Sequence, residues 1–387
     1  MMEEVIGLDL FLVKTLNKMS FSSSKILSAS GNFLSNTFTR SSGLSSSFFF
    51  NPADIKYGNN IFVAIPNDNT TANSQNCRAI KSTNGVTWAV AGSLPIIGTS
   101  SNEQRWKLLI YGNNTYVAFN ESVQMSGLDG GGISTDSGDS WSSIFAPTLY
   151  DTVWGGYLNN FFYRLGGGGT PTLQYSSNGS NWSSILLPTG NFSYPYSMAF
   201  GGGMYSIVCR AGNTCAYSSD GLNWSQASFP IFSENVVYGN GVFVSSSMDQ
   251  NKIAYSSNGQ NWSTVTLSEI ASNKIVRISF LNNKFIAVGV GTDSAFYSDD
   301  GINWSATKLP IIQFWSKPLY SNGLYFTYTS SNIFAYSLDG IKWRPLIING
   351  DITQGFVGVV SANSSNEIVF IGENDLGVNY LYRLTLP

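Results

Sequence analysis

The sequence repeats one short turn motif seven times, and each copy ends in a tryptophan. Six copies read Ser-x-Asp/Asn-Gly-x-x-Trp, and the copy at 134–141 has one more residue before its glycine. Successive tryptophans are 53, 41, 42, 38, 42 and 39 residues apart. This regularity predicts a chain of repeated supersecondary units. The Asp or Asn and the Trp of each copy are Asn84 and Trp88, Asp136 and Trp141, Asn178 and Trp182, Asp220 and Trp224, Asn258 and Trp262, Asp300 and Trp304, and Asp339 and Trp343.

A second repeat, a hairpin with an Asn- or Gly-containing turn between apolar runs, precedes each tryptophan motif. Residues 57–64, 111–118 and 238–244 are clear examples. Asn and Gly tolerate the positive φ that tight hairpin turns require. The hairpin supplies two strands of each unit. A third strand precedes the tryptophan motif and a fourth carries the tryptophan, so each unit has four antiparallel strands. Four short strands about every 41 residues are typical of a propeller blade, so we predict an all-β propeller.

The number of blades follows from the hairpins. Eight hairpins accompany the seven tryptophan motifs, and the last unit, from about residue 355, has only three strands. The missing strand is expected from the N-terminal side, at residues 45–50, where it would close the ring and remove open sheet edges. We predict eight blades, with seven as the alternative. The chain divides into an extension at 1–40 and the propeller at 41–387.

The turn motif resembles the Asp-box repeat of sialidases and sortilin-type receptors, over about residues 45–387. The copy at Ser134–Trp141 keeps the longer form of the box, and the other six have the shorter variant. The resemblance implies a sialidase-type propeller fold in which the box is a structural fastener, away from any active centre. The local chemistry agrees, because an Asp or Asn side chain accepts backbone hydrogen bonds and tryptophan supplies a large apolar plate.

Composition restricts the chemistry. The chain has no histidine, which removes Ser-His-Asp catalysis and the commonest metal ligand, so we expect no metal site and no cofactor. Its 20 basic and 23 acidic residues form no basic run, so nucleic-acid binding is not indicated. Nothing approaches 18 consecutive apolar residues, and we predict no membrane span. Cys209 and Cys215 flank a short loop, where either a disulfide or two free thiols is compatible with the spacing.

An enzyme is the alternative to a binding propeller. Sialidases of the resembled family use three arginines, a tyrosine with a glutamate partner and an aspartate, and carry a Phe/Tyr-Arg-Ile-Pro motif. That motif is missing here, and the nearest fragment, at 163–165, lacks the proline. Arg78, Arg164 and Arg210 lie near predicted loops, so a cluster of three arginines is conceivable. We predict a non-enzymatic protein and keep a sialidase-like hydrolase and a purely scaffolding propeller as alternatives.

The irregular loops indicate where binding would occur. The connections between second and third strands, and those between units, share one face of a propeller and vary most in this sequence. Loops on a rigid scaffold commonly carry binding residues. Amides and carboxylates beside aromatic rings suit sugars, although the aromatics could equally seal the blade junctions. The candidate binding residues are Asp68, Asn73, Asp129, Tyr194, Tyr196, Phe314 and Trp315.

Residues 1–40 fall outside the repeat. Val5, Leu8, Leu12, Leu16 and Met19 recur at helical spacing and predict a short amphipathic helix. Such a helix has no core of its own, so we expect it to dock on another protein or against the propeller. An N-terminal anchor, a long β-rich body and few charges lead us to expect a virion protein, of a bacteriophage tail or capsid surface. Residues 1–40 would contact other virion proteins, and the propeller a host glycan or receptor; an extracellular location is the alternative.

Overall fold

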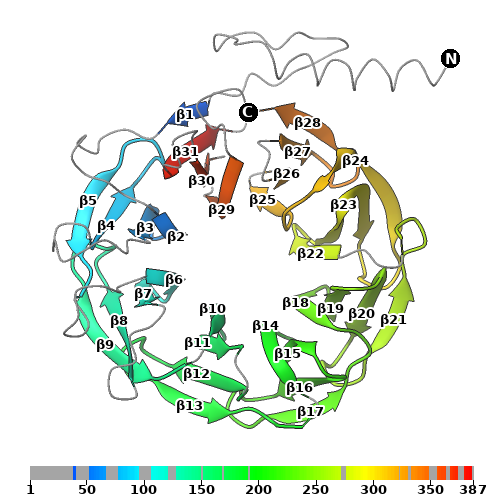
Figure 1. Ribbon diagram of the computed structural model, residues 1–387, viewed down its shortest axis with the longest axis horizontal. Helices are drawn as coiled ribbons and strands as arrows, with labels where there is room; N and C mark the ends of the chain where they lie inside the picture. Colours follow the sequence, from blue (N-terminus) through cyan, green and yellow to red (C-terminus); the bar gives the residue numbers. More distant parts are fainter. Residues whose placement is uncertain are drawn as a thin grey trace.

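The computed structural model describes residues 38–40, 52–66, 77–95, 106–120, 128–149, 151–167, 170–190, 192–271, 276–321, 323–329, 333–347, 355–362, 367–373 and 379–385. These residues contain strands and turns and no helix. Figure 1 shows the sheets arranged in a ring around a central opening, each with one strand facing that opening. The predicted all-β fold of four-stranded antiparallel units is confirmed. The predicted amphipathic helix lies outside the described residues.

The first four sheets each take four consecutive strands of the chain. They are β2 (Pro52–Gly58), β3 (Ile61–Pro66), β4 (Arg78–Ser82) and β5 (Ala89–Ser93); β6 (Trp106–Gly112), β7 (Thr115–Asn120), β8 (Leu128–Ser134) and β9 (Ser142–Pro147); β10 (Thr152–Leu158), β11 (Phe161–Gly166), β12 (Thr172–Ser176) and β13 (Ser183–Leu186); and β14 (Ser193–Gly201), β15 (Met204–Ala211), β16 (Thr214–Ser218) and β17 (Ser225–Ser228).

The other four sheets follow along the chain. They are β18 (Ser233–Gly239), β19 (Val242–Ser247), β20 (Lys252–Ser256) and β21 (Ser263–Thr266); β22 (Val276–Leu281), β23 (Lys284–Ser298) and β24 (Ser305–Phe314); β25 (Leu319–Ser321), β26 (Leu324–Tyr328), β27 (Ile333–Ser337) and β28 (Arg344–Ile347); and β29 (Gly355–Ala362), β30 (Glu367–Glu373) and β31 (Asn379–Thr385) with β1 (Phe38–Arg40).

Two sheets depart from the simple repeat. In the three-stranded sheet, the long strand β23 pairs with β22 through residues 284–289 and with β24 through residues 290–297, so it takes two strand positions. In the sheet of β29, β30 and β31, the strand that pairs with β31 is β1. This segment precedes the predicted residues 45–50, which lie outside the described part of the chain. The strand also falls inside the segment that we assigned to the N-terminal extension.

An aromatic pair recurs between the first and second strands of seven sheets. Its ring centroids are 4.3 to 4.8 Å apart. Such pairs contribute beyond the apolar area that they bury. The pairs are Tyr57 and Phe62, Tyr111 and Tyr116, Tyr157 and Phe162, Phe200 and Tyr205, Tyr238 and Phe243, Phe280 and Phe285, and Tyr320 and Tyr325.

Glycines let these rings pack between sheets. A Cβ added at Gly58 would overlap the ring of Tyr111 in the next sheet, and one at Gly112 would overlap Tyr157. The same relation joins Gly239 to Phe280. Each ring thus covers the backbone at the end of the preceding sheet's first strand, a close approach that only glycine allows. Neighbouring sheets are therefore joined by aromatic packing close to the turns between first and second strands.

The predicted turns have the expected geometry. Asn113 and Asn114, between β6 and β7, have φ of 46° and 56°, and Asn282 and Asn283 repeat the pattern. In the tryptophan motif, Asp220 Oδ1 accepts the amides of Leu222 and Asn223 at 2.8 Å. In six of the seven copies, the indole nitrogen of the motif tryptophan donates to the glycine carbonyl of its own turn, at 2.8 to 3.1 Å. The indole nitrogen of Trp343 is buried without a partner among the described residues.

Candidate functional site

The two faces of the ring differ in regularity. On one, here called the turn face, hairpin turns contact the tryptophan motifs of neighbouring sheets: Asn59 Nδ2 donates to Ser137 Oγ at 3.1 Å, and Asn240 Nδ2 to the Asp299 carbonyl at 2.7 Å. On the other, here called the loop face, first strands begin and second strands end. The irregular connections of the sequence emerge there, so this face is free to carry a specific site.

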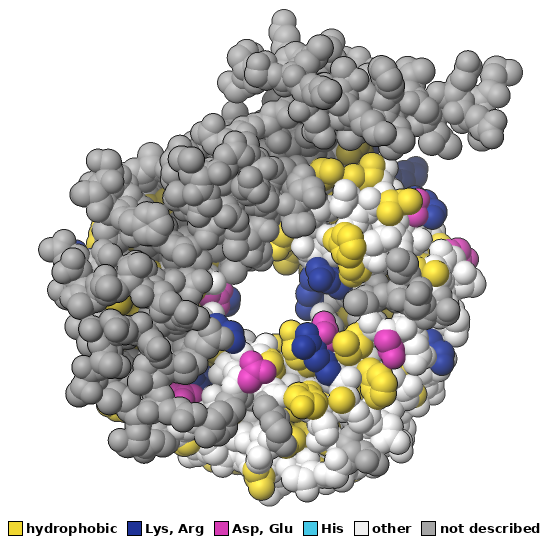
Figure 2. Space-filling view, viewed as in Figure 1, with side chains coloured by type: hydrophobic (Ala, Val, Ile, Leu, Met, Phe, Trp, Pro, Cys, Tyr) yellow, Lys and Arg dark blue, Asp and Glu magenta, His cyan; other side chains and the backbone are white. Residues whose placement is uncertain are grey.

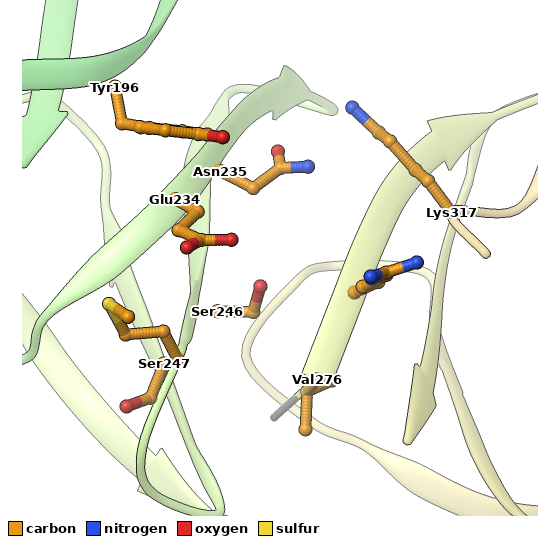
Figure 3. Close-up of a pocket in the computed structure, with 9 residues that line it drawn as sticks. Tyr196, Glu234, Asn235, Ser246, Ser247, Val276 and Lys317 are labelled. Carbon is orange, nitrogen blue, oxygen red and sulfur yellow. The ribbon is translucent and has the colours of Figure 1, made fainter. Parts of the chain in front are cut away.

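A pocket of about 230 Å³ opens on the loop face (Figure 3). Its lining comes from the beginnings of β14, β18 and β22, from the end of β19, and from the residues just before β25. It therefore joins four consecutive sheets. Figure 2 shows Lys and Arg side chains at the rim of the central opening, with apolar side chains beside them. The lining residues are Tyr196, Glu234, Asn235, Ser246, Ser247, Met248, Val276, Arg277 and Lys317.

Two lining residues sit at β-bulges. The pairing of β14 with β15 steps from Pro195 to Ser197 against consecutive partners, which leaves Tyr196 as the extra residue. The pairing of β18 with β19 leaves Glu234 in the same position. A bulge bends its strand and redirects the unpaired side chain, which is why bulges are common beside functional sites. The backbone irregularity thus aims both side chains at the pocket.

Arg210, on β15, holds these two side chains together. Its guanidinium lies 2.5 Å from the Glu234 carboxylate, and its Cζ lies 4.0 Å from the centre of the Tyr196 ring. Arg210 and Glu234 are both partly exposed, so the ion pair contributes little to folding. Its consequence is local, because the carboxylate is neutralised and the phenol ring is held in place by a cation–π contact.

The pocket also holds two cations without a carboxylate partner. Among the described residues, the Nη1 of Arg277 donates to the Trp315 carbonyl at 3.2 Å, and the guanidinium also interacts electrostatically with the phenol of Tyr328. Lys317 has no hydrogen-bond or ion-pair partner in that part of the chain. Lys317 as a whole is exposed to solvent, but the protein atoms around its ammonium group lower its pKa by desolvation from 10.5 to about 8. The group is therefore mostly charged at neutral pH, and an anion nearby would stabilise it.

Asn235 lies between these cations and Tyr196. Its Nδ2 donates to the Ile278 carbonyl of the next sheet at 3.2 Å, and its Oδ1 is buried with no partner among the described residues. Figure 3 shows the side chains of Tyr196, Asn235 and Lys317 directed toward the same space. The pocket thus offers a phenol, an amide, the hydroxyl of Ser246 and two positive charges that no carboxylate of the described residues pairs with.

The structure separates the predicted binding residues. Tyr196 lines the pocket, and Tyr194 and Phe314 are 53% and 67% exposed. Trp315 is fully buried, where it packs against Ile286 and Tyr325 and contributes only its carbonyl to Arg277.

Asp129 is also buried in the protein interior, where it forms an ion pair with Arg164. We therefore leave Trp315 and Asp129 out of the candidate site. Asp68 and Asn73 lie outside the described residues.

The three arginines considered for a sialidase-like centre do not meet. Arg164 is fully buried, 2.8 Å from Asp129 and stacked 3.8 Å from the ring centre of Phe119. Arg78 lies on β4, three sheets from Arg210 on β15. Cys209 and Cys215, whose pairing was left open, are free and buried thiols.

Sequence reasoning missed Glu234, Arg277 and Lys317. A signal for two of them appears when the repeats are aligned on the aromatic residue of the first strand. Asn235, Arg277 and Lys317 each stand three residues before that aromatic, in three consecutive repeats, counted from Tyr238, Phe280 and Tyr320. Side chains at one repeat position point the same way in neighbouring sheets, so this shared spacing is the signal by which the three residues could have been placed side by side.

The ring and its sheets place the chain among the β-propellers with four-stranded blades. YCF48 bound to D1 peptide is similar at 16% identity and a TM-score of 0.51, over 76% of this chain and 91% of that one. The computationally designed Ika8 protein is similar at 12% identity and a TM-score of 0.59, over 89% and 98%. Virginiamycin B lyase from Staphylococcus aureus is similar at 10% identity and a TM-score of 0.52, over 91% and 100%. Identities this low show the fold alone.

No protein-family model and no curated protein matches the sequence. In the described part of the chain, no helix is long and apolar enough to cross a membrane. Within the same residues, no three Cys, Asp or Glu side chains gather as a metal site would require.

Proposed function

We propose that this chain is a non-catalytic binding protein, an eight-bladed propeller closed by β1, that binds a host-surface glycan or a partner protein on its loop face. One observation supports this most directly. The pocket on that face joins four sheets and presents an aromatic ring, an amide and two cations that have no carboxylate partner among the described residues. Concave sites with a few convergent polar groups are where propellers and other rigid scaffolds take ligands.

The virion location remains part of the proposal and rests on the sequence. Residues 1–40 would attach the protein to other virion proteins, and the loop face would then point outward to the host. A peptide partner is also chemically reasonable, because one protein of the same fold is known bound to a peptide. The proposal is therefore a receptor-binding or adaptor propeller, with binding energy supplied on one face.

The test combines ligand screening with one pocket variant. The full chain is applied to an array of glycans and to a library of displayed peptides, beside the variant Tyr196→Ala. We expect retained ligands to bind the variant at least about tenfold more weakly, as for loss of an aromatic contact at a site's centre. Lys252→Gln on the third strand β20 is the control. Ligands that bind wild type and Tyr196→Ala equally, or no ligand in either screen, would remove the proposal.

A glycoside hydrolase is the second candidate, favoured by one specific contact. Tyr196 and Glu234 share the pocket and are both held by Arg210, so a tyrosine and a carboxylate lie together beside cationic groups. A fluorogenic sialoside and a panel of aryl glycosides test it. Product release that disappears in Tyr196→Phe would replace the binding proposal with an enzyme. Binding without turnover would support the binding protein.

A further inference from the structure

We propose that the pocket recognises an acidic side chain of a protein partner, whose carboxylate binds between Arg277 and Lys317. This inference rests on the proposed binding function and names the ligand chemistry of the same face. The partner segment is a peptide with Asp or Glu beside apolar residues. Four observations support it: the charge balance of the pocket, the placement of the two cations, the desolvation of the Lys317 ammonium group, and the exposed apolar side chains nearby.

The charge balance leaves two positive charges unused. Of the described lining residues, Glu234 alone is acidic, and it is already bound to Arg210 at 2.5 Å. Arg277 and Lys317 have no carboxylate partner among the described residues. A site with excess positive charge attracts anions and disfavours cationic partners. A carboxylate is the anionic group that the side chains of a protein partner supply, so we assign a carboxylate.

The two cations are held in related positions. Each stands three residues before the first-strand aromatic of its repeat, on adjacent sheets. The Trp315 carbonyl, two residues before Lys317, accepts from Arg277, so the guanidinium is tied to the segment that carries the lysine. The Ser279 hydroxyl donates to the Pro318 carbonyl at 2.7 Å and fixes the same segment from the other side. Such fixed placement reduces the entropy lost when a ligand binds.

The hydration of Lys317 favours an anionic ligand. Desolvation lowers the pKa of this lysine to about 8 and no internal anion offsets the effect in the described residues. A carboxylate that enters the pocket would restore a favourable partner to the ammonium group. Ionic hydrogen bonds of this kind are stronger in a partly enclosed site than on an open surface.

Exposed apolar side chains at the strand ends near the pocket favour a peptide over a sugar. Tyr194 lies at the start of β14, Phe232 just before β18, and Ile312 and Phe314 at the end of β24. These four side chains are 53%, 41%, 69% and 67% exposed. Figure 2 shows apolar side chains beside the cations on this face. Exposed apolar groups around a polar pocket mark a protein interaction site. Aliphatic side chains such as Ile312 have little to offer a sugar hydroxyl.

The experiment uses the full chain and a displayed library of linear heptapeptides. Peptides selected on the wild type are sequenced, synthesised and titrated against Arg277→Gln, Lys317→Gln and the charge control Lys308→Gln. Lys308 is an exposed lysine on β24 that pairs with Asp293. Thermal unfolding of each variant shows that it is folded.

We expect selected peptides to contain Asp or Glu next to apolar residues, and each pocket variant to weaken binding about tenfold or more, as for a lost charged hydrogen bond. Lys308→Gln should bind as wild type does. Replacing the acidic residue of the peptide by its amide should reproduce the loss.

Each contrary result has a distinct meaning. Peptides that lack acidic residues, or that bind all variants equally, would overturn the carboxylate assignment while a binding face survives. Acidic glycans retained through Arg277 and Lys317, with no peptide selected, would overturn the peptide assignment and keep the proposed function. The absence of any ligand in either screen would overturn both.

Discussion

The guanidinium Nη2 of Arg164 lies 2.8 Å from the carboxylate Oδ2 of Asp129, and the two residues come from neighbouring sheets of the ring. The same carboxylate oxygen accepts the amide of Leu149, and Gln174 Oε1 accepts from Arg164 Nε. Phe119 stacks on the guanidinium. Burial lowers the pKa of Arg164 to about 10 despite Asp129, so it stays charged at neutral pH. The charge pair therefore depends on this internal network.

We predict that Asp129→Asn destabilises the fold by about 3–5 kcal/mol, because it leaves the arginine as an unpaired buried charge. Urea unfolding followed by tryptophan fluorescence measures the change. Arg210→Gln, which breaks the partly exposed ion pair with Glu234, should cost only about 0–1 kcal/mol. Equal effects from the two variants would contradict the structural assignment of the buried pair.

The glycine contacts predict a second set of effects. Gly112→Ala should destabilise by about 1–3 kcal/mol, because its Cβ would overlap the Tyr157 ring of the next sheet. Tyr157→Ala should lower the unfolding free energy by itself. In the double variant, Gly112→Ala should lower it almost no further, because the ring that its Cβ would overlap is gone. Thermal melts of the single and double variants form the cycle. Additive losses would show that the ring does not contact Gly112.

The tryptophan motifs predict sensitivity to acid. Burial raises the pKa of Asp300, but hydrogen bonds from Asn303, Ile302 and Ser298 outweigh it and lower the pKa from 3.8 to about 2. A lowered folded-state pKa stabilises the protein above the unfolded value, and this stabilisation is lost as pH falls from about 4 to about 2.

Asp300→Asn should keep the turn, as in the three copies that carry asparagine, and reduce the loss of stability in this pH range. Asp300→Ala, which removes an acceptor for two backbone amides, should cost about 1 kcal/mol at pH 7. Unfolding free energies of both variants at several pH values test this. If the unfolding free energies of the wild type and of Asp300→Asn fell equally steeply below pH 4, Asp300 would not be the source of the acid sensitivity.

The lowered pKa of Lys317 predicts pH-dependent binding. Affinity for an acidic peptide should fall as pH rises through about 8, because the ammonium group that faces the carboxylate loses its proton. The variant Lys317→Arg keeps its charge at higher pH. Its affinity for the peptide should therefore change by no more than about twofold between pH 7 and 9.5. Fluorescence anisotropy at several pH values compares them. A parallel decline for both would assign the effect to another group.

Thiol reactivity tests the cysteine assignment. Burial raises the pKa of Cys209 to about 11 and that of Cys215 to about 12, so neither is a reactive thiolate at neutral pH. A thiol reagent should leave both unmodified in the native protein, react at the half-buried Cys77, and modify all three after unfolding without reductant. Mass spectrometry locates the labels. Fewer than three labels in the unfolded protein would indicate a disulfide.

Much of the fold was predictable because the repeat encodes local structure. The Asn and Gly turns, the Asp or Asn side chains that hold the motif turn, and the four-strand unit all depend on contacts within a few residues. The predicted strand at 45–50 is different, since the segment that pairs with β31 is 38–40. Several Ser- and Phe-rich segments there fit a strand, and only pairing with a distant chain end selects one.

The candidate site was predicted only in part. Tyr196 was named from its place in a connection between repeats, whereas Glu234, Arg277 and Lys317 were not, because a charged residue at the start of a strand is ordinarily a solvated one. Asp129 and Trp315 were assigned to the surface from their loop context, and the structure buries both. Burial of a loop residue depends on what the adjacent sheet places against it.

The sequence by itself determined the all-β fold, the four-stranded unit and its turns, since backbone dihedrals and short hydrogen bonds follow from residues close together in the chain. The tertiary structure decided which side chains meet across sheets. Arg277 and Lys317 are 40 residues apart in the sequence and line one pocket because successive repeats rotate about a common axis. The charge and the hydration of that pocket depend on groups from four sheets. They could not be predicted from any short stretch of sequence.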